Sequence, residues 1–147
     1  MGFDVYGRSG NQFRNSGWSW GPLWDYVEQV CSDILTKKDI DNGKYNDGHL
    51  IDADKAIGVG ERLNELIKSG ATARHIQKQL KEHVLMPDII CKYCDGKGKR
   101  KDSPAPKCNV CLGSGRVRPD ETKYQLDIDN IQTFADFCIE SDGYRIN

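Results

Sequence analysis

Apolar residues recur with a period of about 3.6 residues in four segments of the chain, and this period predicts amphipathic helices. Three helices are expected over residues 22–36, 52–69 and 72–85, and a fourth between Asp129 and Gly143. Pro22 suits the first turn of its helix, because a proline there loses no backbone hydrogen bond. Trp24 falls on the same helix and is expected in the core.

The ends of the helices carry recognisable signals. Asp52 is a candidate N-cap, and Gly70 is a typical stop after the same helix. Asp129 and Gln132 have the spacing of a capping box. Gly60, within the second helix, would let another element approach closely. A close contact is therefore expected at Gly60.

Alternation of apolar and polar residues is confined to short stretches. Residues 3–7 predict a strand, residues 124–126 are a second candidate, and residues 144–146 are a third that could pair with residues 3–6. Turn-forming residues dominate positions 7–17 and 38–51, so both segments are expected as loops.

Cysteine supplies the strongest motif. The pattern C-x-x-C-x-G-x-G occurs twice, at Cys91/Cys94 and at Cys108/Cys111, with 13 residues between the pairs. Two such pairs provide the four thiolates of a tetrahedral structural zinc, and the glycines allow tight turns whose amides point at sulfur. The pattern predicts one structural zinc. Redox chemistry of the C-x-x-C pairs is the alternative.

The two repeats resemble the cysteine-rich zinc region of DnaJ-type chaperones and the zinc module of the small anti-TRAP regulator. DnaJ proteins carry four such repeats and two zinc ions, so two repeats imply one zinc. The His-Pro-Asp signature of a J-domain does not occur in the sequence. The resemblance therefore implies a metal-binding hairpin and no chaperone activity.

Together these elements predict an α+β fold that is mainly α, with about four helices, a minor short-stranded sheet and an inserted zinc hairpin. Residues 1–88 would form the N-terminal helical part of a single domain, residues 89–119 the zinc hairpin, and residues 120–147 a C-terminal strand and helix that pack back on the first part. Because the hairpin lies between helices, its ends must be close in space.

Composition adds limits. The chain has 147 residues and a net charge of −1, and no apolar run reaches the length of a membrane span. Asp4 stands where a signal peptide has basic residues, so a cytoplasmic protein is expected. Cys31 and Cys138 are then expected as reduced, buried residues, and His75 and His83 as surface histidines.

Charge is unevenly distributed. Residues 91–118 contain eight cations, Lys92, Lys97, Lys99, Arg100, Lys101, Lys107, Arg116 and Arg118, against Asp95 and Asp102, a balance of +6. Four thiolates with one zinc would lower this to about +4. Such a hairpin suggests contact with nucleic-acid phosphates through Lys99, Arg100 and Lys101. Alternatively, the cations balance the zinc–thiolate charge and keep the loop soluble.

Two other regions offer binding candidates. One contains Arg14, Asn15, Trp18 and Trp20, where the two tryptophans would share one face of an extended segment and either contact a ligand or form a lid over the core. The other is the loop with Tyr45, Asp47 and His49, which can bind a polar ligand or form a plain Asx turn.

A second resemblance covers most of the chain. It rests on residues 2–7, on the segment from Phe13 to Trp24, on residues 45–49 and on residues 129–146. Together these resemble a group of small uncharacterised bacterial and bacteriophage proteins. The resemblance implies a bacterial or phage origin and assigns no activity.

The sequence lacks a phosphate-binding loop, a G-x-S-x-G elbow and an H-E-x-x-H motif. We therefore expect a non-enzymatic, zinc-stabilised binding protein, a phage or bacterial regulator or inhibitor that docks on a host macromolecule, with protein favoured over nucleic acid. The alternative is a small-ligand or nucleotide-binding protein that uses Trp18, Trp20 and residues 45–49. A hydrolase that uses Asp47 and His49 is the third hypothesis.

Overall fold

The computed structural model describes residues 2–147, which form two compact units. The first contains the chain up to Lys78 together with Gln125–Asn147, and the second contains Gln79–Tyr124. Elements of the first unit are β1 (Gly2–Gly7), β2 (Gln12–Ser16), α1 (Gly17–Cys31), α2 (Lys37–Asn42), β3 (His49–Ile51), α3 (Ala53–Lys68), α5 (Ile128–Glu140) and β6 (Tyr144–Ile146). The second unit has β4 (Ile89–Ile90), β5 (Arg116–Val117) and the 3-10 turn η1 (Asp120–Thr122), and α4 (Ala71–Leu85) belongs in part to each.

The first unit is built on a four-stranded antiparallel sheet with the strand order β2-β1-β6-β3. β1 and β2 form a hairpin in which Val5 pairs with Phe13. β6 lies between β1 and β3, so that Ile146 is opposite Val5 on one side and His49 on the other. The predicted strand over residues 3–7 and its pairing with residues 144–146 are therefore confirmed.

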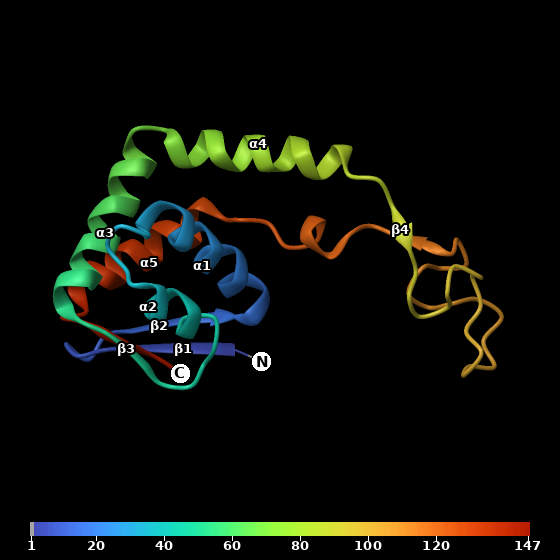
Figure 1. Cartoon of the computed structure of the whole chain (residues 1–147), viewed down its shortest axis with the longest axis horizontal. Helices are drawn as coiled ribbons and strands as arrows, with labels where there is room; N and C mark the ends of the chain where they lie inside the picture. The colour runs from blue at the N-terminus through green and yellow to red at the C-terminus, as the bar shows by residue number, and fades with distance from the viewer. Residues whose placement is uncertain (1) are drawn as a thin grey trace. The chain divides into compact units, whose positions relative to one another are not determined.

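Helices α1, α3 and α5 of the first unit lie over one side of this sheet (Figure 1). The core beneath α1 is aromatic: Trp20 stacks between Phe3 and Trp24, with ring centroids 5.1 and 5.3 Å apart. The indole N–H of Trp20 donates to Gly43 O at 2.8 Å, and that of Trp24 donates to Ile40 O at 2.9 Å. Both indoles are buried with their donors satisfied, as expected for Trp24.

Helices α3 and α5 pack closely at Gly60. A Cβ atom at this position would lie 2.7 Å from Ala135 O and 2.6 Å from Ile139 Cγ1, both on α5. Asp52 caps α3, and its Oδ1 accepts from Lys55 N–H at 2.9 Å. The expected close contact and the expected cap are both confirmed.

Helix α1 begins earlier than its apolar period suggested. Ser16 is its N-cap, and Ser16 Oγ accepts from Ser19 N–H at 3.2 Å. Pro22 therefore lies inside the helix, and the extended segment expected for Trp18 and Trp20 is wrong. Helical positions two residues apart are rotated by about 200°, so these two tryptophans face nearly opposite sides of the helix.

Segments expected as loops contain β2, α2 and β3. α2 starts with a capping box between Thr36 and Asp39. The strand expected over residues 124–126 is wrong, because this stretch follows η1 without regular structure. The Asp129 capping box is also wrong: Asp127 is the N-cap of α5, and Gln132 donates instead to Asn64 Oδ1 of α3 at 2.6 Å.

Residues 2–147 contain five α-helices and small antiparallel sheets, so the predicted α+β class, mainly α, is confirmed. Cys31 and Cys138 are fully buried in the first unit, also as expected. None of the helices in this part of the chain has both the length and the apolar character that a bilayer crossing requires.

Candidate metal centre

The second unit contains a hairpin whose base is closed by β4 and β5, with Ile89 opposite Val117. Both C-x-x-C pairs lie between these strands. Cys91 N–H donates to Gly115 O at 2.9 Å, and Cys108 N–H donates to Gly98 O at 2.8 Å. The first cysteine of each repeat is thus hydrogen-bonded to the last glycine of the other, so the two repeats are held together in an equivalent way on both sides.

The four thiols of the repeats converge on one point. The Sγ atoms of Cys91, Cys94, Cys108 and Cys111 all lie within 4.8 Å of one another, and all four residues are buried. The Cys91–Cys108 separation is 4.0 Å and the Cys94–Cys111 separation is 3.7 Å. A tetrahedral zinc with Zn–S bonds of about 2.3 Å holds its sulfurs about 3.8 Å apart. The spacing therefore fits four ligands of one ion.

Backbone amides point at two of the sulfurs. Gly98 N–H donates to Cys94 Sγ, and Gly115 N–H donates to Cys111 Sγ, each at 3.3 Å. Hydrogen bonds of this kind favour the thiolate over the thiol and fix the direction of its lone pairs. The glycine amides thus have the role that the C-x-x-C-x-G-x-G pattern predicted.

The turns after each cysteine pair need unusual backbone angles. Asp95 and Leu112 occupy equivalent places in the two repeats, with φ of 51° and 55°. Gly98 and Gly115 have φ of 74° and 77°, and a Cβ at either position would overlap a carbonyl of the other repeat, that of Gly113 or of Gly96. Glycine is therefore required both by the positive φ and by the close approach of the two repeats.

Protonation differs between the two amide-bonded thiols. Burial opposes ionisation of Cys111, but hydrogen bonds from the N–H groups of Gly115 and Gly113 and from the thiols of Cys94 and Cys108 outweigh it and lower the pKa of Cys111. At Cys94 burial dominates and raises the pKa, and the neighbouring thiols add to the increase against the N–H of Gly98. A bound cation would displace the protons that remain on these thiols.

The chemistry of the ligand set limits what this centre can do. Four sulfur ligands around a tetrahedral ion leave no position for a catalytic water, so the centre suits a structural metal. The buried cluster of the second unit consists of the four cysteines with Val117 packed against them. Because this cluster contains so little apolar surface, a bound ion would add stability that apolar packing does not supply.

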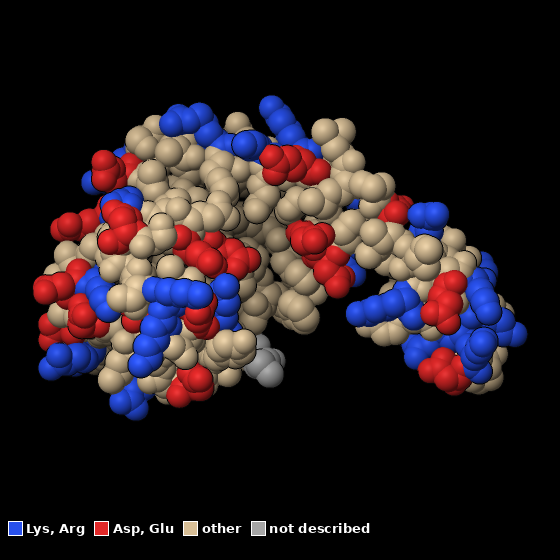
Figure 2. Space-filling model, viewed as in Figure 1, with Lys and Arg blue, Asp and Glu red and all other residues tan. Residues whose placement is uncertain are grey.

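The cations expected at a binding surface lie on this hairpin. Figure 2 shows Lys and Arg side chains gathered over it. Arg100 pairs with Asp102 and donates to Asn109 Oδ1 at 3.2 Å, and its guanidinium lies 5.8 Å from the ring centre of Tyr93. Lys99 and Lys101 are exposed, and neither forms an ion pair within residues 2–147. The sequence did not single out Tyr93, although its place among cations was a usable signal.

The tryptophan candidates are separated by the fold. Trp20 is 1% exposed and belongs to the core, whereas Trp18 is 65% exposed on α1. Arg14, on β2, pairs with Asp4 of β1. Asn15 points the other way and exchanges side-chain hydrogen bonds with Asn130 of α5, at 2.9 and 2.8 Å. These side chains therefore have different partners and do not line one pocket.

The second candidate loop is similarly dispersed. Tyr45 and Asp47 are exposed, whereas His49 Nε2 lies 2.9 Å from Asp39 Oδ1. Asp39 is buried and also accepts from Lys55 Nζ at 2.8 Å. Its carboxylate holds together α2, β3 and α3, which is a structural role. The Thr36–Asp39 spacing of a capping box was the sequence signal for it.

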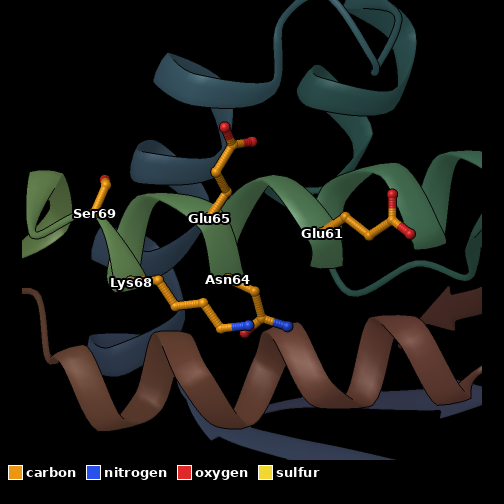
Figure 3. Close-up of a pocket in the computed structure, with 5 residues that line it drawn as sticks. All are labelled: Glu61, Asn64, Glu65, Lys68 and Ser69. Atoms are coloured by element: carbon orange, nitrogen blue, oxygen red, sulfur yellow. The ribbon is translucent and has the colours of Figure 1, made fainter.

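The end of α3 has a hollow on its surface, and His83 lies in the second unit. A hollow of ≈ 610 Å³ is lined by Glu61, Asn64, Glu65, Lys68 and Ser69 at the end of α3. Asn64 and Lys68 point towards α5 whereas Glu65 points away from it (Figure 3), so the lining side chains do not all converge on one point. His83 is buried in the second unit, so its expected surface position is wrong, and Arg118 donates to its carbonyl oxygen.

Comparisons of the chain with protein-family models, with curated proteins and with solved structures each returned no match.

Proposed function

We propose that the four cysteines of the hairpin bind one zinc ion and that this ion has a scaffolding role. The supporting observation is the convergence of Cys91, Cys94, Cys108 and Cys111 within 4.8 Å at separations that suit tetrahedral sulfur coordination. Tetrahedral four-sulfur sites bind zinc or iron. Two C-x-x-C pairs whose sulfurs accept hydrogen bonds from glycine amides favour the closed zinc site.

The protein would then be a non-enzymatic binding protein, a phage or bacterial regulator or inhibitor, that docks on a macromolecule through the zinc hairpin. Two features support this role. The metal ligands are buried, so the ion cannot reach a substrate. The hairpin also presents Tyr93, which is 51% exposed, together with Lys99 and Lys101 on a backbone that the metal makes rigid. Rigid, cation-rich surfaces lose little conformational entropy on binding.

Metal analysis of cysteine variants tests the zinc site. Wild-type protein is expected to contain one zinc per chain, and Cys91→Ser or Cys111→Ser to lose it, with fast amide hydrogen exchange across residues 89–117. Cys31→Ala is the matched control, because Cys31 is equally buried but belongs to the other unit. A Cys91→Ser protein that binds zinc as tightly as wild type would contradict the ligand assignment, and iron in place of zinc would contradict the choice of metal.

The docking role has its own test. A partner captured from host lysate by wild-type protein should be lost with Cys91→Ser and retained with Cys31→Ala. Equal capture by all three proteins would place the docking surface outside the hairpin.

A further inference from the structure

We infer that the partner of the hairpin is a single-stranded nucleic acid. Its phosphates contact Lys97, Lys99, Lys101 and Lys107, and a base stacks on Tyr93. This rests on the proposed function, because the surface exists only when the hairpin is folded.

The second unit has an excess of positive charge, and part of it has no ion-pair partner. The second unit carries ten Lys and Arg against six Asp and Glu, whereas the first carries eleven against sixteen. Within the hairpin Arg100 pairs with Asp102 and Arg118 pairs with Asp88. Lys97, Lys99, Lys101 and Lys107 form no ion pair with any residue of 2–147. These four lysines attract a polyanion.

The second step is the position of these lysines. Lys97 and Lys99 flank Gly98, and Lys107 precedes Cys108. The hydrogen bond from Cys108 N–H to Gly98 O, 2.8 Å long, places the two chain segments side by side. Lys97, Lys99 and Lys107 therefore lie on two neighbouring backbone segments next to Cys94 and Cys108. Preorganised cations release counterions from phosphates without first having to be ordered.

The third step is the aromatic ring. Tyr93 is 51% exposed, with Lys92 Nζ 5.3 Å and Arg100 Cζ 5.8 Å from its ring centre. Its position between Cys91 and Cys94 restricts its motion, because both cysteines are buried ligands. Both cations lie over the ring. A base can stack there once one of these flexible side chains moves aside, and the displaced cation can then contact a neighbouring phosphate.

An acidic protein segment would also satisfy the lysines. It would make no use of the exposed part of the Tyr93 ring, because carboxylate side chains bind lysines with no requirement for a ring. Duplex DNA would likewise offer phosphates but no unstacked base. The combination of unpaired lysines with an exposed ring therefore favours a single strand.

Fluorescence anisotropy with a labelled oligothymidine of about 12 nucleotides tests the inference, since single-strand sites span about 4–16 nucleotides. Four phosphate contacts predict that a plot of the logarithm of the association constant against the logarithm of the salt concentration has a slope of about −3 between about 50 and 200 mM salt. The triple variant Lys97→Gln, Lys99→Gln, Lys101→Gln should reduce the slope to about −1. The triple variant Lys37→Gln, Lys38→Gln, Lys68→Gln removes the same charge from exposed lysines of the first unit and should leave the slope unchanged.

Tyr93→Leu separates a nucleic acid from an acidic protein. It keeps an apolar side chain and all cations, and should weaken oligothymidine binding about tenfold with an unchanged salt slope. The inference would be overturned in favour of an acidic protein if Tyr93→Leu bound the oligonucleotide as tightly as wild type and polyglutamate displaced it equally well from both proteins. A duplex that binds as tightly as the single strand would overturn it as well.

Zinc measured in the same samples separates this inference from the proposed function. A zinc-loaded protein that does not bind oligothymidine overturns the inference and leaves the metal site in place. A zinc-free protein that binds with the expected slope supports the nucleic-acid partner and contradicts the role of the metal. A zinc-free protein that does not bind overturns both.

Discussion

A single methyl group at Gly98 provides a sharp test of how the two repeats fit together. In Gly98→Ala the new Cβ would overlap Gly113 O and lie 3.0 Å from Gly113 C, which belong to the backbone of the other repeat. Gly113 lies two residues after Cys111 and Gly98 lies four residues after Cys94, so neither repeat can move aside without displacing a cysteine of the cluster. The variant also has to hold an alanine at φ of 74°.

The two costs add in the folded, metal-bound state. An alanine in the left-handed region costs about 1–2 kcal/mol, and displacement of packed backbone costs a further 1–3 kcal/mol or so. A total of about 3 kcal/mol corresponds to a roughly hundredfold loss of zinc affinity. Competition with a chromophoric zinc chelator measures this ratio directly.

Gly113→Ala is the matched control. Gly113 has φ of 91°, so the backbone strain is similar, but the nearest neighbours of its Cβ are side-chain atoms of Lys107, at 3.2 Å or more. That flexible chain can move, so only the strain remains and zinc affinity should fall about tenfold. Equal losses in the two variants would refute the reasoning that close approach of the repeats, and not backbone angle alone, requires glycine at position 98.

Two further predictions concern the first unit. Gly60→Ala should lower the free energy of unfolding by about 2 kcal/mol, because its Cβ would meet Ala135 O at 2.7 Å. The control Gly58→Ala should change this free energy by less than about 1 kcal/mol. Equal melting temperatures of the two variants would contradict the tight α3–α5 contact. Burial opposes ionisation of Asp39, but hydrogen bonds from Lys55, His49 and Thr36 outweigh it and lower the pKa of this carboxyl. The charged form therefore stabilises the fold above the unfolded-state pKa of about 3.9, and this stabilisation is lost as pH falls towards the lower folded-state pKa. Asp39→Asn should cost about 2 kcal/mol at neutral pH, with a smaller difference from wild type in acid; a difference in urea-unfolding free energy that is independent of pH would contradict the ionised carboxylate.

Local signals were sufficient where one residue type determines the geometry. Asp52 could be identified as a cap because a short carboxylate satisfies free helix amides. Gly60 predicted a close contact because only glycine leaves room for another backbone. The cysteine repeats predicted convergence of their thiols because C-x-x-C spacing restricts where two sulfurs can lie.

Long-range interactions account for the elements that the sequence did not predict. β3 has only three residues and exists because β6 supplies its hydrogen bonds, and its sequence carries no alternation that could be recognised. β2 is rich in polar residues because one of its faces is exposed, and it was therefore expected as a loop. α2 is a six-residue helix whose capping carboxylate, Asp39, also binds Lys55 of α3. Such partners are distant in sequence, so local periodicity contains no record of them.

The binding candidates also depend on long-range interactions that the sequence did not reveal. Trp20 could not be assigned to the core until the start of α1 at Gly17 placed its ring between Phe3 and Trp24. The role of Tyr93 depends on Arg100, whose guanidinium is brought to the ring by the fold of the hairpin. Residue type indicated which side chains were suitable, and the tertiary structure determined which of them lie together.

X-ray absorption spectroscopy at the zinc edge tests the central claim most directly. A purified, folded protein should show a single shell of four sulfur atoms at about 2.3 Å from zinc, with no nitrogen or oxygen neighbour. A shell with fewer than four sulfurs, a light-atom ligand, or a folded protein that contains no zinc while all four hairpin thiols react with a thiol reagent would contradict it.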